Sequence, residues 1–95
     1  MKIVQLDLRG CKDAYDMHDR LSAALDFPSW YGNNWDALYD MLTTEIDANK
    51  IIIKGESSLP ESMNDAIKML HIILDDTNAF HKKIGWDPLT YEIID

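Results

Sequence analysis

The chain has 95 residues, of which 46% are hydrophobic, and this size supports one modest hydrophobic core and predicts a single domain over residues 1–95. Seventeen acidic residues against nine basic ones give a formal net charge of −8 at pH 7. Such a charge repels the phosphates of nucleic acids and anionic lipid headgroups, so we expect neither direct nucleic-acid binding nor membrane association.

One strand and one helix are expected at the start of the chain. Residues 2–8 are apolar and β-branched with partial alternation, and Gly10 follows them, a pattern that predicts a strand. Residues 13–25 carry apolar side chains at the spacing of one helical stripe. Asp13 is the expected N-cap, because its carboxylate can accept hydrogen bonds from free backbone N–H groups.

A turn and a second helix follow. Pro28 should end the first helix, since the residue before a proline is forced out of the α region. An aromatic turn at residues 30–32 comes next. Asn33 or Asn34 can then cap a second helix, whose apolar stripe runs to about Thr44.

The middle of the chain predicts a buried strand and a long helix. Residues 50–54 contain three consecutive isoleucines, which is typical of a strand buried on both faces. From Pro60 or Ser62 to Asp76, apolar residues recur at helical spacing and predict the third helix.

The last part of the chain completes the expected fold. Residues 78–88 show little periodicity and predict a loop, and residues 89–94 predict a third strand. The expected order is therefore β-α-α-β-α-β. Because strands separated by helices usually run in the same direction, the fold class is α/β, with a small three-stranded parallel sheet packed against three main helices.

The cysteine and histidine content argues against disulfides and metal sites. Cys11 is the only cysteine, which agrees with a reducing compartment. His18, His71 and His81 have no metal-ligand spacing with one another or with Cys11, so neither a metal nor a cofactor is expected. No apolar segment has the length of a signal peptide or a membrane span, so we expect a cytoplasmic location.

Residues 30–40 are the most informative segment, because they join an aromatic turn to a helix that opens with two carboxylates. Between Leu21 and Asn49 there is no lysine or arginine. Five negative charges fall in that stretch, at Asp26, Asp36, Asp40, Glu45 and Asp47. This concentration of one sign of charge predicts a binding surface for a cationic partner.

Asp36 and Asp40 should lie one turn apart on the second helix, opposite Leu38, so that both carboxylates point outward. Tyr39 and Trp35 fall on the seam between the acidic and the buried face. A solvated helix face, with acids near its positive end, is the simplest alternative. However, the like-charge pair costs about a few tenths of a kcal/mol, which favours a functional reason for it.

The acidic residues allow two further interpretations. Paired carboxylates can serve in acid–base catalysis or bind a divalent cation, but no third ligand and no catalytic motif accompanies them, so no enzymatic activity is expected. Asp75 and Asp76 fall at the expected C-terminal end of the third helix, where the dipole disfavours negative charge. A functional surface and a fraying helix explain that conflict equally well.

Residues 31–40 read Tyr-Gly-Asn-Asn-Trp-Asp-Ala-Leu-Tyr-Asp and resemble the barstar family of ribonuclease inhibitors, in the pattern Tyr-Gly-x-Asn-x-Asp-Ala-Leu-aromatic-Asp. Pro28 upstream and the order of elements also agree with that family, so a barstar-like fold is implied. The resemblance covers roughly the first forty residues well and the remainder only by the order of elements.

The resemblance implies an intracellular inhibitor, or immunity protein, that forms a 1:1 complex with a cognate basic ribonuclease toxin. In this family the turn and second helix plug the ribonuclease active site, with carboxylates at phosphate positions. Asp40 would be central. The other implied partner-binding residues are Trp30, Tyr31, Gly32, Asn34, Asp36 and Tyr39, with Asp75 or Asp76 as an acidic contact from the last helix.

Three departures from the family pattern bear on which nuclease is bound. Tyr39 stands where an indole is familiar, and Glu45 stands where another aromatic contact is expected. Residues 78–88 form a longer connection than the family's usual one. Its Phe80 and Trp86 either add contacts or cover the sheet.

Three functions are compatible with the surface that the sequence predicts. The first is an inhibitor of a cognate ribonuclease, and the second is an acidic binding module for a basic partner that is not a nuclease. The third, a small carboxylate-dependent hydrolase, has no supporting motif.

Overall fold

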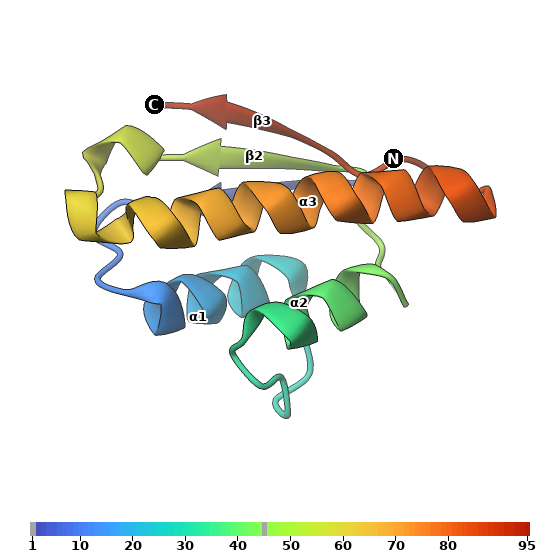
Figure 1. Cartoon of the computed structure of the whole chain (residues 1–95), viewed down its shortest axis with the longest axis horizontal. Helices are drawn as coiled ribbons and strands as arrows, with labels where there is room; N and C mark the ends of the chain where they lie inside the picture. Colours follow the sequence, from blue (N-terminus) through green and yellow to red (C-terminus); the bar gives the residue numbers. More distant parts are fainter. Residues whose placement is uncertain (1, 45) are drawn as a thin grey trace.

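Within residues 2–44 and 46–95, which the computed structural model describes, three short strands form a parallel sheet in the order β1-β2-β3 (Figure 1). The paired positions run in register, so that Gln5, Ile52 and Glu92 lie side by side across the sheet. The strands are β1 (Ile3–Asp7), β2 (Lys50–Lys54) and β3 (Thr90–Ile94). The predicted α/β fold and the order β-α-α-β-α-β are confirmed.

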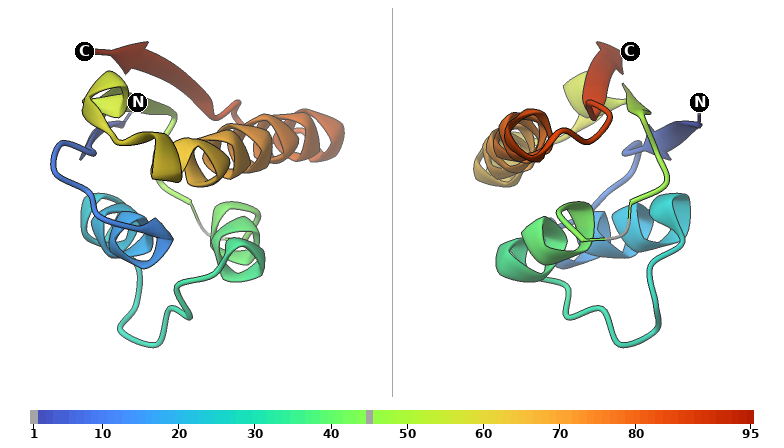
Figure 2. Two further views of the ribbon diagram at one scale, coloured as in Figure 1. Left: turned by 60° about the vertical axis from the view of Figure 1, so that its left-hand side comes forward. Right: turned by 90° about the vertical axis from the view of Figure 1, so that its right-hand side faces the viewer.

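The helices cover only one face of this sheet (Figure 2). Right-handed crossovers between successive neighbouring strands place their helices on the same side. In β1, Val4 is buried against the helices while Gln5 is exposed on the other face. The prediction that β2 is buried on both faces was wrong. Ile51 and Ile53 are buried, but Ile52 points to the uncovered face and is only half-buried.

Helix α1 (Ala14–Leu25) begins and ends where the sequence predicts. The Asp13 carboxylate accepts a hydrogen bond of 2.7 Å from the backbone N–H of Asp16 and caps the helix. Asp26 adopts a left-handed conformation with φ of 57° and closes the helix two residues before Pro28. The chain is thereby free to turn back before the next helix.

Helix α2 (Trp35–Leu42) is short and stops before Thr44, the predicted end. Asn34, rather than Asn33, is its N-cap. The hydroxyls of Thr43 and Thr44 donate to the carbonyls one turn earlier, at 2.7 and 2.8 Å. The Thr44 hydroxyl satisfies the Asp40 carbonyl, and the Tyr39 carbonyl accepts both the backbone N–H and the hydroxyl of Thr43, so the helix can end there.

Helix α3 (Asn64–Ile84) is longer than predicted, and the predicted loop over residues 78–88 was wrong up to Ile84. Two short turns, η1 (Glu56–Ser58) and η2 (Glu61–Met63), precede it. Gly85, with φ of 79°, ends the helix. Asp75 and Asp76 therefore lie in mid-helix, and the predicted conflict with the negative end of the helix does not arise.

The sequence prediction misses this extension because the inward-facing side chains of the extended part are polar. Thr77 and His81 continue the buried stripe of Leu70 and Leu74, and both are at most 2% exposed. The Thr77 hydroxyl donates to the Ile73 carbonyl at 2.7 Å. A prediction from apolar periodicity alone does not count such residues, so it ends the helix about two turns early.

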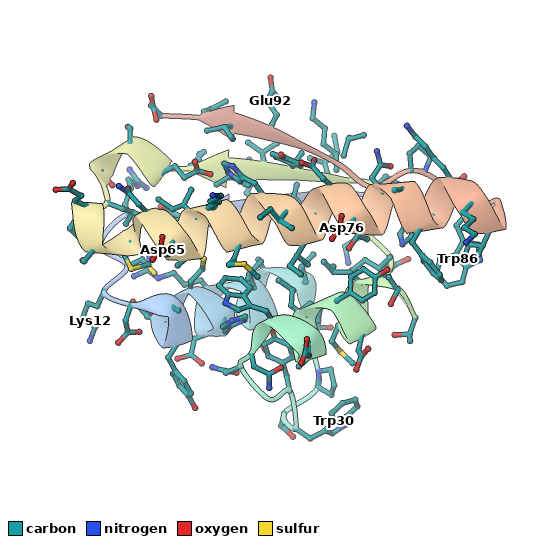
Figure 3. The ribbon with its side chains drawn as sticks, viewed as in Figure 1. Lys12, Trp30, Asp65, Asp76, Trp86 and Glu92 are labelled. Atoms are coloured by element: carbon teal, nitrogen blue, oxygen red, sulfur yellow. The ribbon has the colours of Figure 1, made fainter. Side chains whose placement is uncertain are left out.

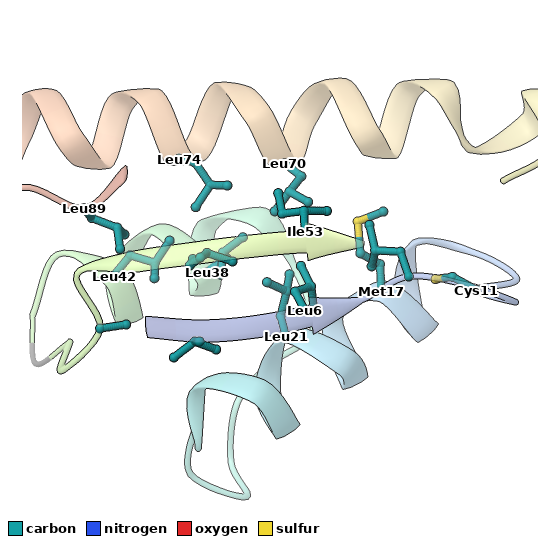
Figure 4. Close-up of a cluster of buried hydrophobic side chains, with 14 of the residues drawn as sticks. Leu6, Cys11, Met17, Leu21, Leu38, Leu42, Ile53, Leu70, Leu74 and Leu89 are labelled. Carbon is teal, nitrogen blue, oxygen red and sulfur yellow. The ribbon is translucent and has the colours of Figure 1, made fainter. Parts of the chain in front are cut away.

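The hydrophobic core fills the space between the sheet and the three helices (Figure 4). Strands β1 and β2 and helices α1, α2 and α3 contribute fully buried side chains, and β3 adds the half-buried Tyr91. The largest are Leu6, Leu8, Met17, Leu21, Leu38, Leu42, Ile51, Ile53, Leu70, Leu74 and Leu89. Cys11 is buried beside them. No helix in the described ranges is long and apolar enough to cross a membrane.

His81 ties three parts of the molecule together. Its Nε2 lies 2.8 Å from the carbonyl oxygen of Leu42, at the end of α2, and its Nδ1 lies 3.0 Å from the carbonyl oxygen of Asp87. Both partners only accept hydrogen bonds, so a ring nitrogen that carries a proton donates it to the carbonyl beside it. The imidazole thus fixes the end of α2 to α3 and to the segment that leads into β3.

We expect His81→Leu to lower the free energy of unfolding by about 1–3 kcal/mol, because it leaves the buried Leu42 carbonyl without a donor. Urea unfolding monitored by circular dichroism measures this change. Ala79→Leu, at an exposed position of the same helix, is the matched control and should change stability by less than about 0.5 kcal/mol. Equal effects of the two substitutions would contradict the role given to His81.

Candidate functional site

The outer face of α2 carries two carboxylates without cationic partners. Asp36 and Asp40 are exposed and project from the side opposite Leu38, which is fully buried. At 100° per residue, their directions differ by about 40°. Within residues 2–44 and 46–95 no basic side chain forms a salt bridge with either of them. The outward orientation that the sequence predicts is confirmed, and this charge is available to a partner.

The turn before α2 is fixed by side-chain hydrogen bonds. The Asn34 side chain accepts from the Ala37 backbone N–H at 2.8 Å and donates to the Gly32 carbonyl at 3.2 Å. A Cβ atom at Gly32 would lie 3.1 Å from the Asn34 amide nitrogen, so a larger residue would press on the cap. Asn33, with φ of 49°, donates to the Asp19 carboxylate of α1 at 2.8 Å.

Tyr31 is buried beneath this turn and holds it to α1. Its hydroxyl oxygen lies 2.7 Å from Nδ1 of His18, which is itself 2% exposed. The rings of Trp35 and Phe27 pack against this pair, on the His18 and Tyr31 sides respectively. Burial lowers the pKa of His18 and raises the pKa of Tyr31, so both are uncharged at neutral pH. Tyr31 therefore supports the surface from below, whereas Trp30 beside it is 73% exposed.

Aromatic side chains lie on two sides of the α2 carboxylates. Figure 3 shows Trp30 at the tip of the turn, on the side of α2 away from α3. Tyr39 is half-buried on the opposite side, with its ring centroid 6.5 Å from that of Phe80 in α3. The predicted position of Tyr39 on the seam of the helix is confirmed.

The two adjacent carboxylates of α3 face different neighbours. Asp75 lies with Tyr91 of β3 at a cavity of about 220 Å³, and burial together with the Asp75 charge raises the pKa of Tyr91. Asp76, labelled in Figure 3, is exposed and lies one turn before Phe80, whose ring contacts Tyr39 of α2. The structure thus brings Asp76, and not Asp75, to the side of α3 that borders α2.

The other predicted features of the acidic stretch are placed as follows. Asp47 lies 3.8 Å from the Lys2 amine, and Asp26 is exposed at the end of α1. Glu45, the position of a predicted departure from the family, lies outside the described residues. The described part of the chain has no group of three or more His, Cys, Asp or Glu side chains arranged to hold a metal ion.

The contacts made by His18 and Phe80 have no direct signal in the sequence. His18 of α1 pairs with a tyrosine 13 positions away, in the turn between α1 and α2. Its one available signal is its position between Met17 and Leu21, on the buried side of α1. Phe80 falls in the segment for which the sequence predicts a loop, so its contact with Tyr39 could not be expected.

Comparison with known proteins adds a family assignment to this geometry. A protein-family model described as Barstar (barnase inhibitor) matches residues 1–88. A protein of Bacillus subtilis (strain 168) named "Putative ribonuclease inhibitor YrdF" is 43% identical over 47 residues, which span 50% of this chain and 52% of that protein. The chain thus matches about half the length of this curated relative.

We expect His18 to make the protein less stable in mild acid. Because burial lowers the pKa of His18 below 6.5 in the folded state, the unfolded chain binds the proton more readily. The free energy of unfolding should therefore decrease as the pH falls from above about 6.5 towards the folded-state pKa. Urea unfolding at several pH values between about 7.5 and 5.5 measures this dependence.

His18→Gln is the control, because glutamine keeps a hydrogen-bonding group near Tyr31 but does not titrate. The variant should lose the part of the pH dependence that belongs to His18. Identical pH profiles of the variant and the original chain would show that His18 does not contribute.

Proposed function

The chain belongs to the barstar family, a family of ribonuclease inhibitors, and we propose that it binds and blocks the active site of a cognate basic ribonuclease. In this proposal it acts as the intracellular immunity protein against that toxin, in a 1:1 complex, and has no catalytic activity of its own. The observation that carries the proposal is the pair of exposed carboxylates on α2, Asp36 and Asp40, which lack cationic partners among the described residues.

The chemistry of a ribonuclease active site is complementary to this face. Such a site is a cationic cleft shaped to hold phosphates, and two carboxylates one helical turn apart can occupy phosphate positions. In the complex, the carboxylates would be desolvated against cationic groups. Aromatic side chains around them, Trp30 and Tyr39, would exclude water and strengthen these contacts.

The rigidity of the site supports the same proposal. Binding costs less conformational entropy when the contact residues are already ordered. The Asn34 cap fixes the start of α2, and the bond between His18 and Tyr31 fixes the turn before it. Gly32, exposed in this turn, allows a partner's backbone to approach closely.

The proposal includes Asp76 of α3 as a further acidic contact and excludes Asp75, which lies beside β3. Asp76 is on the side of α3 that borders α2, whereas Asp75 lines the cavity beside Tyr91. The two substitutions Asp76→Asn and Asp75→Asn thus form a matched pair for mapping the edge of the interface.

Inhibition of RNA cleavage tests the proposal directly. Barnase is the appropriate probe, because the description of the matching family names barnase as the protein that is inhibited. Titration of barnase with the purified chain should abolish RNA cleavage at an equimolar ratio. Lysozyme, a basic protein that does not act on RNA, is the comparison. Equal binding to lysozyme, without inhibition of barnase, would favour a general module for basic partners.

Asp40→Ala should weaken the complex by more than about 2 kcal/mol, because it leaves the partner's cationic groups buried and unpaired. This is the general threshold for interface hot spots, for which barstar itself supplies a known example. The free protein should keep its stability or gain about a few tenths of a kcal/mol, since the repulsion with Asp36 is relieved. Calorimetric titration and thermal melting measure the two effects.

Glu92→Ala is the matched control for this substitution. It removes the same charge from the uncovered face of the sheet, where Glu92 pairs with Lys50 at 3.3 Å (Figure 3). Its effect on affinity should be small. An unchanged affinity of Asp40→Ala would remove Asp40 from the site, and unfolding of that variant would make it a structural residue.

Association with barnase should slow markedly as salt is added. The stretch from residue 22 to 48 contains five acidic residues and no lysine or arginine, and such a concentration of negative charge steers a cationic partner towards the complex. Screening shortens the range of this field to about 8–10 Å near physiological ionic strength. Stopped-flow association rates from low to high salt measure the effect, and a rate indifferent to salt would contradict steering.

A further inference from the structure

Three aromatic rings from three separate segments form a continuous row beside the α2 carboxylates. Tyr39 of α2 contacts Phe80 of α3, with ring centroids 6.5 Å apart and planes at 64°. Phe80 in turn contacts Trp86, which follows α3, with centroids 6.3 Å apart and planes at 87°. We call Tyr39, Phe80 and Trp86 the aromatic row. Edge-to-face contacts of this kind leave parts of the ring faces free.

The aromatic row is held in place from below by a buried histidine. Trp86 packs edge-on against His81, with ring centroids 5.3 Å apart. The Trp86 backbone N–H donates to the His81 carbonyl at 2.8 Å. The two ring nitrogens of His81 lie 2.8 and 3.0 Å from the carbonyl oxygens of Leu42 and Asp87. The far end of the row is therefore ordered before any partner arrives, which lowers the entropic cost of a contact there.

The aromatic row is not sealed into the core. Trp86 remains 42% exposed, and Phe80 and Tyr39 are half-buried. Trp86 also lines a surface hollow of about 430 Å³ together with Thr44 and Asp47. Part of the Trp86 side chain is therefore open to a partner at this hollow.

The charges around the aromatic row favour a cation. Asp40 precedes the row on α2, Asp76 lies one turn before Phe80 on α3, and Asp47 lines the hollow beside Trp86. Two basic residues oppose this trend: Lys83, three positions beyond Phe80 on α3, and Lys2, whose amine lies 3.8 Å from the Asp47 carboxylate and which lines a neighbouring hollow with Trp86. Carboxylates beside aromatic faces suit the planar guanidinium of arginine, which can stack on a ring and pair with a carboxylate at once.

We propose that the aromatic row is a second part of the docking surface and binds an arginine side chain of the ribonuclease outside its active-site cleft. The inference rests on the proposed function, because one ribonuclease must contact both the α2 carboxylates and the aromatic row. Tyr39, which lies on α2, belongs to both surfaces. Carboxylates that imitate phosphate suit the active site of many ribonucleases. A contact outside the cleft depends on the particular enzyme, so the row contributes selectivity.

Conservative substitutions within the aromatic row test this inference against barnase. Phe80→Leu and Trp86→Leu keep an apolar side chain but remove the ring face, and each should raise Kd about three- to thirtyfold, the range of an exposed to a desolvated cation–π contact. Trp86→Phe keeps a ring and should recover most of the affinity. Calorimetric titration measures Kd, and thermal melting of each variant shows that it is folded.

Ile72→Leu is the matched control, because Ile72 is an exposed apolar residue of the same helix that lies outside the row. It should leave Kd within about twofold of the original value. Should Trp86→Leu fail to fold, Phe80→Leu decides the outcome alone. Kd values within twofold for the folded row variants would overturn the inference and leave the proposed function intact. A failure of the unsubstituted chain to bind barnase would overturn both.

Discussion

Helix α2 has eight residues, too few for a stable helix in water, so its shape is imposed by its attachments to the rest of the molecule. Leu38 and Leu42 anchor its inner side in the core. Its first turn is closed by Asn34, and its last turn is tied to α3 by the bond from His81 to the Leu42 carbonyl. Because the attachments all lie at the ends and on the inner side, the outer side is left free to carry charge.

Asp36 lies in the first turn of α2, where the helix dipole favours an acid, but Asp40 has no such support within the protein. Asp36 and Asp40 repel each other across one turn, and no described basic side chain is paired with either. Other acids of the chain do have local partners, such as Asp7 with Arg9 at 2.7 Å and Asp16 with Arg20 at 3.5 Å. The repulsion between these two acids lowers the stability of the free protein only slightly, and a helix anchored in the core tolerates it. A bound cationic partner would instead interact favourably with the same charges.

The sequence predicted those features that depend on local spacing. The apolar stripes located every helix and strand, and the positions of Asp36 and Asp40 on their helix followed from the helical period alone. Features that depend on distant partners were missed. The extension of α3 is stabilised through His81, whose hydrogen-bond partner Leu42 is 39 positions away. The exposure of Ile52 depends on which face the crossovers cover, and a run of isoleucines does not encode that choice.

The two parts of the proposed surface differ in the physical range of their interactions. The carboxylates of α2 act over many ångströms, so they attract any cationic cleft and weaken as salt screens them. The aromatic row acts only at contact, through ring faces that salt affects far less. Its order depends on His81, the same residue that fixes the end of α2. One buried imidazole therefore sets the relative position of the two parts of the proposed surface.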